Sequence, residues 1–246
     1  MKKFIYLFFT LLMVCSQLVS AQSLYLKDNL QRAKPGDYIV ITANKTNTLM
    51  HIYARQGQFL IIEEIAAPMS RKAGHMDWHN WVKNNAPGHN SWVMYEIDLN
   101  SGRMQRYYSF SKCGWFEIPE VDNFLSKLLN LRLDYIPEKE RKKVGLKIFA
   151  ESEEARLWQP NLVVEGQVIR GVKFDAWRTR WPKDGSDLSG KVIEMYLPQD
   201  NQFYPAYFPY WLQIQNAIGK SRVRIIDSGT NLWSPKPPMM SQMPTP

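Results

Sequence analysis

A chain of 246 residues, 45% of them hydrophobic, is long and apolar enough to bury a core of its own. Its two cysteines exclude a disulfide-rich secreted scaffold. The formal net charge of +8 suits contact with anionic membrane surfaces, but the charge is spread along the chain without a recognition motif, so we expect no nucleic-acid partner.

The N-terminus has the pattern of a secretory signal peptide. Lys2 and Lys3 give a positive start, an apolar run extends from Phe4 to Val14, and Val19-Ser20-Ala21 supplies the small residues that signal peptidase accepts. The run is too short for a membrane-spanning helix, which needs about 20 residues. We therefore expect residues 1–21 to be removed and the mature protein to be periplasmic or secreted. An uncleaved N-terminal anchor is the alternative.

The two cysteines raise separate questions. Lipidation at Cys15 would tether the protein to a membrane, although Val14 before it is larger than the residue normally found there. Cys113 is then the lone cysteine of the mature chain. A lone thiol outside the cytoplasm is either buried or paired with another chain, and burial is the commoner case.

The first half reads as a short helix followed by strands. Ser23 can cap a helix that continues to Ala33 and ends at Lys34-Pro35-Gly36. Apolar residues then alternate with polar ones between turn segments, which predicts an antiparallel meander of about five strands, interrupted by a polar segment at 69–88. The predicted strands are Tyr38 to Ala43, Leu49 to Ala54, Phe59 to Ile65, Ser91 to Leu99 and Arg103 to Phe110.

The middle reads as helical and the last third as strands again. Five apolar residues recur at the spacing of one helix face: Val121, Phe124, Leu125, Leu128 and Leu129. Two further helices are predicted, from Pro137 to Gly145 and around Glu151 to Trp158. Alternation then returns in four segments, Val172 to Trp177, Val192 to Leu197, Leu212 to Ile218 and Arg222 to Ile226.

This element order predicts an α+β fold, a curved antiparallel sheet of half-barrel-like meanders with helices packed on one face. Because the chain shows neither an internal repeat nor a linker, we expect one domain over residues 22–234. Proline, methionine and serine dominate residues 235–246, which predicts a disordered tail.

Asp227-Ser228-Gly229-Thr230 resembles the active-site loop of aspartic proteases. Those enzymes need two aspartates that share a proton, and the chain holds no second loop of this kind. The simpler interpretation is a strand that ends in a polar turn. A serine, histidine and aspartate that meet only in space would escape this test, so a hydrolase with a spatially assembled site remains an alternative.

His75 and His79 have the spacing of two zinc ligands on a helix. Zinc peptidases place a glutamate base directly after the first histidine, and this chain has Met76 there. A solvated loop or short helix is therefore the favoured interpretation of the pair. We predict no catalytic residues, no metal and no cofactor.

The aromatic residues offer a binding surface, because nine tryptophans is a high number for one chain. Aromatic side chains that line the concave side of a curved sheet would hold acyl chains or other apolar ligands, whereas those inside the core only stabilise the fold. Two prolines keep residues 203–211 from forming a regular central strand. The candidate ligand-binding residues are Trp177, Trp181, Tyr204, Tyr207, Phe208, Tyr210 and Trp211.

With its signal peptide, N-terminal helix, curled sheet and plugging helices, the predicted architecture resembles the periplasmic carriers and receptors of outer-membrane lipoproteins. The resemblance covers most of the mature chain, but it rests on no short motif and therefore transfers no functional residue. It implies a non-enzymatic periplasmic protein that binds a lipid or a lipidated protein in an apolar cavity. The alternative is an envelope or secreted protein whose aromatic surface binds another protein.

Overall fold

The computed structural model describes residues 22–70, 77–118, 124–145, 152, 154–199, 203–216 and 219–237. The expected signal peptide with Cys15, the first histidine of the predicted pair, His75, and residues 238–246 of the expected tail lie outside the described residues.

Strands dominate the described part of the chain. One large sheet contains β1 (Ser23–Tyr25), β2 (Tyr38–Ala43), β3 (Thr46–Gln56), β4 (Phe59–Pro68), β5 (Ser91–Asp98), β6 (Arg103–Ser109), β7 (Gly114–Glu117), β8 (Arg132–Tyr135), β11 (Phe174–Arg180), β12 (Val192–Pro198), β13 (Trp211–Asn216) and β14 (Gly219–Gly229). A separate hairpin consists of β9 (Leu162–Val164) and β10 (Gln167–Ile169). The helices are α2 (Leu26–Leu30), α3 (Trp78–Lys83) and α4 (Phe124–Leu129), and 3-10 turns cover Glu138–Glu140 and Glu154–Arg156.

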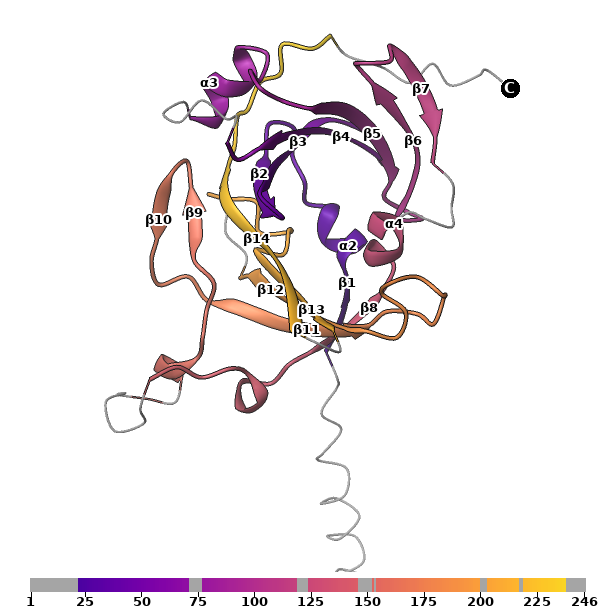
Figure 1. Cartoon of the computed structure of the whole chain (residues 1–246). Helices are drawn as coiled ribbons and strands as arrows, with labels where there is room; N and C mark the ends of the chain where they lie inside the picture. Colours follow the sequence, from indigo (N-terminus) through magenta and orange to yellow (C-terminus); the bar gives the residue numbers. More distant parts are fainter. Residues whose placement is uncertain are drawn as a thin grey trace, which may run out of the picture.

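The large sheet is antiparallel throughout and curls strongly on itself (Figure 1). Its 12 strands follow the order β1-β8-β11-β12-β13-β14-β2-β3-β4-β5-β6-β7, so β1 and β7 are the two edges. Helix α2 follows β1 directly, and α4 contacts both α2 and β6. The two helices therefore lie between the two ends of the curled sheet, on its inner side (Figure 1).

The predicted α+β class is wrong, because the described part of the chain is mostly β and has no helical layer on a face of the sheet. The helices of the described residues are only five or six residues long. The predicted helix from Ser23 begins instead as an edge strand paired with β8, and the predicted helices at 137–145 and 151–158 are no more than 3-10 turns in the described residues. Strand pairing with distant segments overrides the local helical pattern at these places.

The turn between β2 and β3 illustrates where local sequence decides the structure. Asn44 and Lys45 both have positive φ angles, 48° and 65°. Two such residues in succession form the tight hairpin turn whose twist matches that of the flanking strands. The predicted strand from Tyr38 to Ala43 is confirmed at these bounds, whereas the next strand begins at Thr46, before its predicted start at Leu49.

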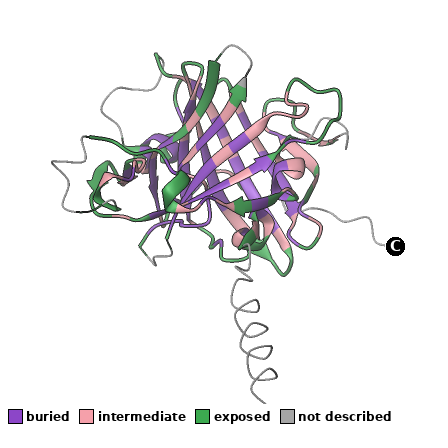
Figure 2. Ribbon diagram, turned by 90° about the horizontal axis from the view of Figure 1, so that it is seen from below, coloured by how far each residue is buried: buried purple, intermediate pink, exposed green. Residues whose placement is uncertain are grey.

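The sheet carries a core on each face, and buried residues concentrate along its strands (Figure 2). On the inner face, Leu30 of α2 and Leu128 of α4 belong to the same apolar cluster as Ile62 of β4. On the outer face, α3 and the segment of residues 231–237, here called the C-terminal strap, cover a second cluster that includes Trp81 and Leu232. Alternation along the strands separates the two clusters, because successive side chains point to opposite faces.

Candidate functional site

The hollow of the curled sheet contains an apolar cavity of about 250 Å³. This volume is slightly below the range of about 300–1,000 Å³ that is usual for pockets of drug-sized ligands, so a single apolar chain or a small apolar molecule suits it. Leucine and isoleucine side chains form much of its wall. They include Leu26 and Leu30 of α2, Leu125 and Leu128 of α4, and Ile62 of β4.

Helix α4 closes one side of the apolar cavity and is fastened to the loop after β11. Phe124 lines the cavity, is 41% exposed, and stacks on Trp181 with 5.3 Å between the ring centroids. Lys127 Nζ lies 2.7 Å from Asp184 Oδ2, and this hydrogen bond holds the pKa of Asp184 well below its usual range. Because α4 has only six residues, these contacts and its apolar side chains hold it in place rather than its own helical stability.

The wall of the apolar cavity includes one carboxyl group, that of Glu64 in β4. The hydroxyl of Tyr95 in β5 donates to Glu64 Oε2 at 3.3 Å. Burial raises the pKa of Glu64, and the hydrogen bond from Tyr95 only partly opposes this. Desolvation likewise raises the pKa of Tyr95, which keeps its hydroxyl protonated and available as a donor.

The neighbouring Glu63 points to the other face of the sheet and has a different environment. It is completely buried under the C-terminal strap. Its carboxylate accepts hydrogen bonds from Trp92 Nε1 at 2.8 Å and from Ser234 Oγ at 2.6 Å, and His51 Nδ1 lies 2.9 Å from its second oxygen. This carboxylate therefore has the partners that a buried charge requires, and its role is to attach the strap to the sheet.

A polar groove of about 880 Å³ adjoins the apolar cavity. Tyr207 belongs to the walls of both. Its hydroxyl donates to Asp37 Oδ2 at 2.7 Å, on the side of the groove. Burial raises the pKa of Asp37, and the hydrogen bond from Tyr207 opposes the shift. The basic side chains of Arg32 and Lys34 also line the groove, which gives it a positive character that the cavity lacks.

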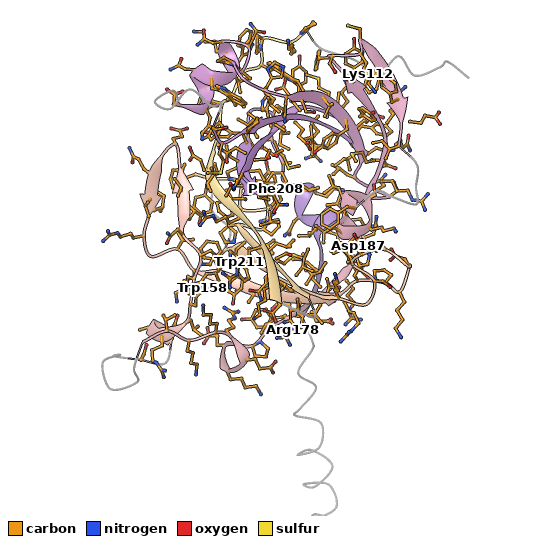
Figure 3. The ribbon with its side chains drawn as sticks, viewed as in Figure 1. Lys112, Trp158, Arg178, Asp187, Phe208 and Trp211 are labelled. Carbon is orange, nitrogen blue, oxygen red and sulfur yellow. The ribbon has the colours of Figure 1, made fainter. Side chains whose placement is uncertain are left out.

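The seven predicted ligand-binding aromatics do not form one surface. Tyr207 and Phe208 are in the wall of the apolar cavity, and Figure 3 shows Phe208 near the centre of the curl. Tyr204 lines the polar groove, and Trp181 lies behind Phe124. The structure thus brings two of the seven to the cavity and two to the groove, with Tyr207 shared by both.

The remaining three aromatics pack elsewhere. Tyr210 is fully buried, and its hydroxyl donates to Ser228 Oγ at 2.8 Å. Trp177 contacts Tyr135 edge-on. Trp211 precedes a cavity-lining leucine in β13, so it points to the opposite face, where it meets Trp158 with 4.9 Å between the ring centroids (Figure 3).

Asp227 of the protease-like loop and His79 of the predicted zinc pair both make contacts that stabilise the fold. The carboxylate of Asp227, in β14, accepts from the backbone N–H groups of Gly166 and Ser228 at 3.1 and 2.9 Å, which joins the β9–β10 hairpin to the sheet. His79, in α3, packs edge-on against Tyr38. The described residues contain no group of three or more histidine, cysteine, aspartate or glutamate side chains that could hold a metal ion.

Cys113 is exposed in the turn between β6 and β7, where its φ angle is 50°. The expectation of a buried thiol is therefore wrong. Alternation stops at this turn, so the neighbouring strands gave no information about the side chain's burial.

Sequence reasoning missed the polar group of the apolar cavity. Glu63 and Glu64 are adjacent in β4, so strand alternation points them to opposite faces, in agreement with their contacts. Alternation gave no sign that the inner face at Glu64 borders unfilled space, because that space depends on α2, α4 and the segment before β13, which are distant in sequence.

Comparisons with known proteins identify a family. The model of the CT021 protein family matches residues 48–170, whereas no curated protein matches the chain significantly. A solved structure that resembles it is that of the hypothetical protein CT021 from Chlamydia trachomatis, with a TM-score of 0.63 and 18% sequence identity. The match covers 89% of this chain and 100% of that chain, and at this identity it concerns the fold alone. Within the described residues, none of the helices has the length and apolar character needed to cross a membrane.

Proposed function

The chain belongs to the CT021 protein family, and we propose that this member is a non-enzymatic binding protein that holds one apolar chain in its apolar cavity. The occupant in this proposal is an acyl chain, carried by a lipid or by a lipidated protein. The observation that carries the proposal is the cavity itself, because unfilled apolar space weakens packing and costs stability. A bound chain would restore those contacts.

Two further features support a lipid as the source of the chain. The polar groove shares the wall at Tyr207 with the apolar cavity and bears Arg32 and Lys34. Basic side chains at the edge of an apolar site suit an anionic headgroup or membrane surface. The predicted signal peptide would deliver the protein to the periplasm or the exterior, where it would meet such surfaces.

Blocking the apolar cavity tests the proposal. Val223 lines the cavity, whereas Val168 in β10 is 57% exposed and lies outside it. We expect Val223→Trp to weaken binding of an apolar fluorescent probe by at least about tenfold, which corresponds to roughly 1.4 kcal/mol, and Val168→Trp to leave it unchanged. Native mass spectrometry of the chain purified from its own cells should detect a bound acyl compound in the unsubstituted protein.

Two results would contradict the proposal. One is an unsubstituted chain that neither binds the probe nor carries a copurified acyl compound. The other is equal binding by Val223→Trp and the unsubstituted chain, provided that circular dichroism shows both to be folded, because the probe would then occupy a different surface.

A second candidate function is binding of a protein at the β6–β7 hairpin. β7 is an edge of the sheet, and a free edge is able to pair with a strand of another chain. Its partly exposed Trp115 and Phe116 lie beneath Arg106 and Lys112, with 4.8 and 5.2 Å from cation to ring centroid. Such aromatic and arginine groups are frequent in protein interfaces. Crosslinking in cells from a photoreactive residue at Glu117 would capture a single protein partner if this candidate is correct.

A further inference from the structure

Glu64 is the feature of the apolar cavity that a purely structural role explains least. We propose that Glu64 selects the head of the bound chain: the cavity admits an acyl chain whose carbonyl is neutral, as in an ester or an amide, and rejects a free carboxylate. This inference rests on the proposed function, since it presupposes that the cavity binds an apolar chain.

The described wall of the apolar cavity offers Glu64 no counter-charge. Among the described residues that line the apolar cavity, Glu64 is the one ionisable carboxyl, and no lysine, arginine or histidine accompanies it. Burying a carboxylate without a cation is costly, and burial raises the pKa of Glu64 accordingly. A ligand carboxylate beside it would repel an ionised Glu64, and beside a protonated Glu64 it would leave one negative charge without a cation in a poorly solvated site.

Glu64 also retains hydrogen-bonding capacity after its contact with Tyr95. Tyr95 donates to Oε2, whereas Oε1 has no hydrogen-bond partner among the described residues, so its hydrogen-bonding capacity is open to a ligand in the cavity that Glu64 lines. A protonated carboxyl has one O–H donor. With the proton on Oε1, Glu64 would donate to the carbonyl oxygen of an ester or amide, which satisfies both groups inside the apolar wall.

The polar groups near Glu64 already have partners of their own. The hydroxyl of Tyr207 donates to Asp37, and the carboxylate of Glu63 belongs to the network on the outer face. Glu64 and Tyr95 are therefore the groups of the described wall that are placed to meet a polar ligand atom. The position of Glu64 would set how deep the acyl chain extends beyond its carbonyl.

Three probes with the same chain distinguish the possible head groups. Methyl decanoate has a neutral carbonyl, decanoic acid has a carboxylate at pH 7, and decylamine has an ammonium group. Their affinities are measured at pH 7 by displacement of a fluorescent apolar probe from the full chain and from Glu64→Gln. Glu117→Gln is the matched control, because this carboxylate is exposed on β7. Glutamine keeps an acceptor for Tyr95 and removes only the ionisable group.

We expect methyl decanoate to bind at least about tenfold more tightly than decanoic acid to the unsubstituted chain, because the acid meets a like charge or must take up a proton. This ratio of the affinities for the ester and the acid, the affinity gap, should shrink to less than about threefold in Glu64→Gln and persist in Glu117→Gln. A gap that is absent, or that stays the same in Glu64→Gln, would refute the selective role and leave the binding function intact. If decylamine binds best and loses its advantage in Glu64→Gln, Glu64 recognises cations and the inference is wrong. If none of the three probes binds, the proposed function fails together with it.

Discussion

The same substitution at the two adjacent carboxyl groups of β4 should lower the stability by very different amounts. Glu63 has three hydrogen-bond partners on the outer face, His51, Trp92 and Ser234. Glu63→Ala removes the common acceptor of these buried groups, and each buried polar group left without a partner costs roughly 1–3 kcal/mol. We therefore expect Glu63→Ala to lower the free energy of unfolding by at least about 3 kcal/mol.

Glu64→Ala should lower the free energy of unfolding by less than about 1 kcal/mol. Only Tyr95 donates to this carboxyl, at 3.3 Å, and the loss of that weak bond is offset because a desolvated carboxyl is removed. The shortened side chain borders a cavity that already exists, so it creates no separate void. Urea unfolding followed by far-ultraviolet circular dichroism measures both variants, with an unchanged m value as the sign that the same two states are compared.

The pH dependence provides an independent check of the assignment. The pKa of Glu64 is raised in the folded protein above its ordinary value of 4.5. The favourable contribution of Glu64 to the free energy of unfolding is thus complete below pH 4.5, and it is lost as the pH rises through the folded-state pKa. The stability of Glu64→Gln relative to the unsubstituted chain should therefore increase as the pH rises from about 4.5. If Glu64→Ala is as destabilising as Glu63→Ala, or if the Gln variant shows no such trend, our description of the two faces is wrong.

Three further substitutions test other parts of the structure. Gly229→Ala would place a Cβ 2.6 Å from a ring carbon of the buried Tyr38, so thermal unfolding should show a loss of about 1–3 kcal/mol; an unchanged melting temperature would contradict the packing at this point. Phe124→Ala removes the stacked ring that holds α4 over the cavity, and stopped-flow displacement should show dissociation of an apolar probe faster by up to about tenfold; an unchanged rate would mean that the ligand leaves by another route. Tyr207→Phe removes a hydrogen bond that lowers the pKa of Asp37. Urea unfolding should therefore show that the free energy of unfolding falls by roughly 1–3 kcal/mol, and this loss should grow as the pH rises above 3.8, the ordinary pKa of the carboxyl. A loss of stability that does not depend on pH would contradict this.

The sequence predicted the parts of the fold that short-range patterns determine. The strand from Tyr38 to Ala43 has an apolar alternation and is followed by two residues that accept positive φ, and both its bounds are confirmed. The short strands at the β1 end of the sheet were missed for the opposite reason. β8 (Arg132–Tyr135) is four residues long and β1 is three; β1 pairs with β8, and β8 pairs also with β11. Pairing between segments so distant in sequence is a property of the assembled sheet, which a local window does not contain.

The candidate site was less predictable than the fold, and for a related reason. The aromatic residues were chosen for their abundance, yet Trp177 and Tyr210 are used for packing. Burial of an aromatic ring stabilises a core whether or not a ligand is near it, so abundance does not distinguish the two uses. The cavity wall consists mostly of leucine and isoleucine, whose composition is that of any core.

Strand β4 shows that this chain is able to satisfy a buried carboxylate completely. On the outer face, Glu63 is provided with donors from β5 and from the C-terminal strap, more than one hundred residues further along the chain. On the inner face, the next residue receives one long hydrogen bond and borders unfilled space. An unfilled cavity and a poorly paired carboxyl each lower stability, and an apolar residue at position 64 would remove the second of these costs. The cavity and the poorly paired carboxyl of Glu64 occur together, although the same strand provides full hydrogen bonding for Glu63 one residue earlier. This combination is the pattern expected where binding, rather than stability, determined the residue at position 64.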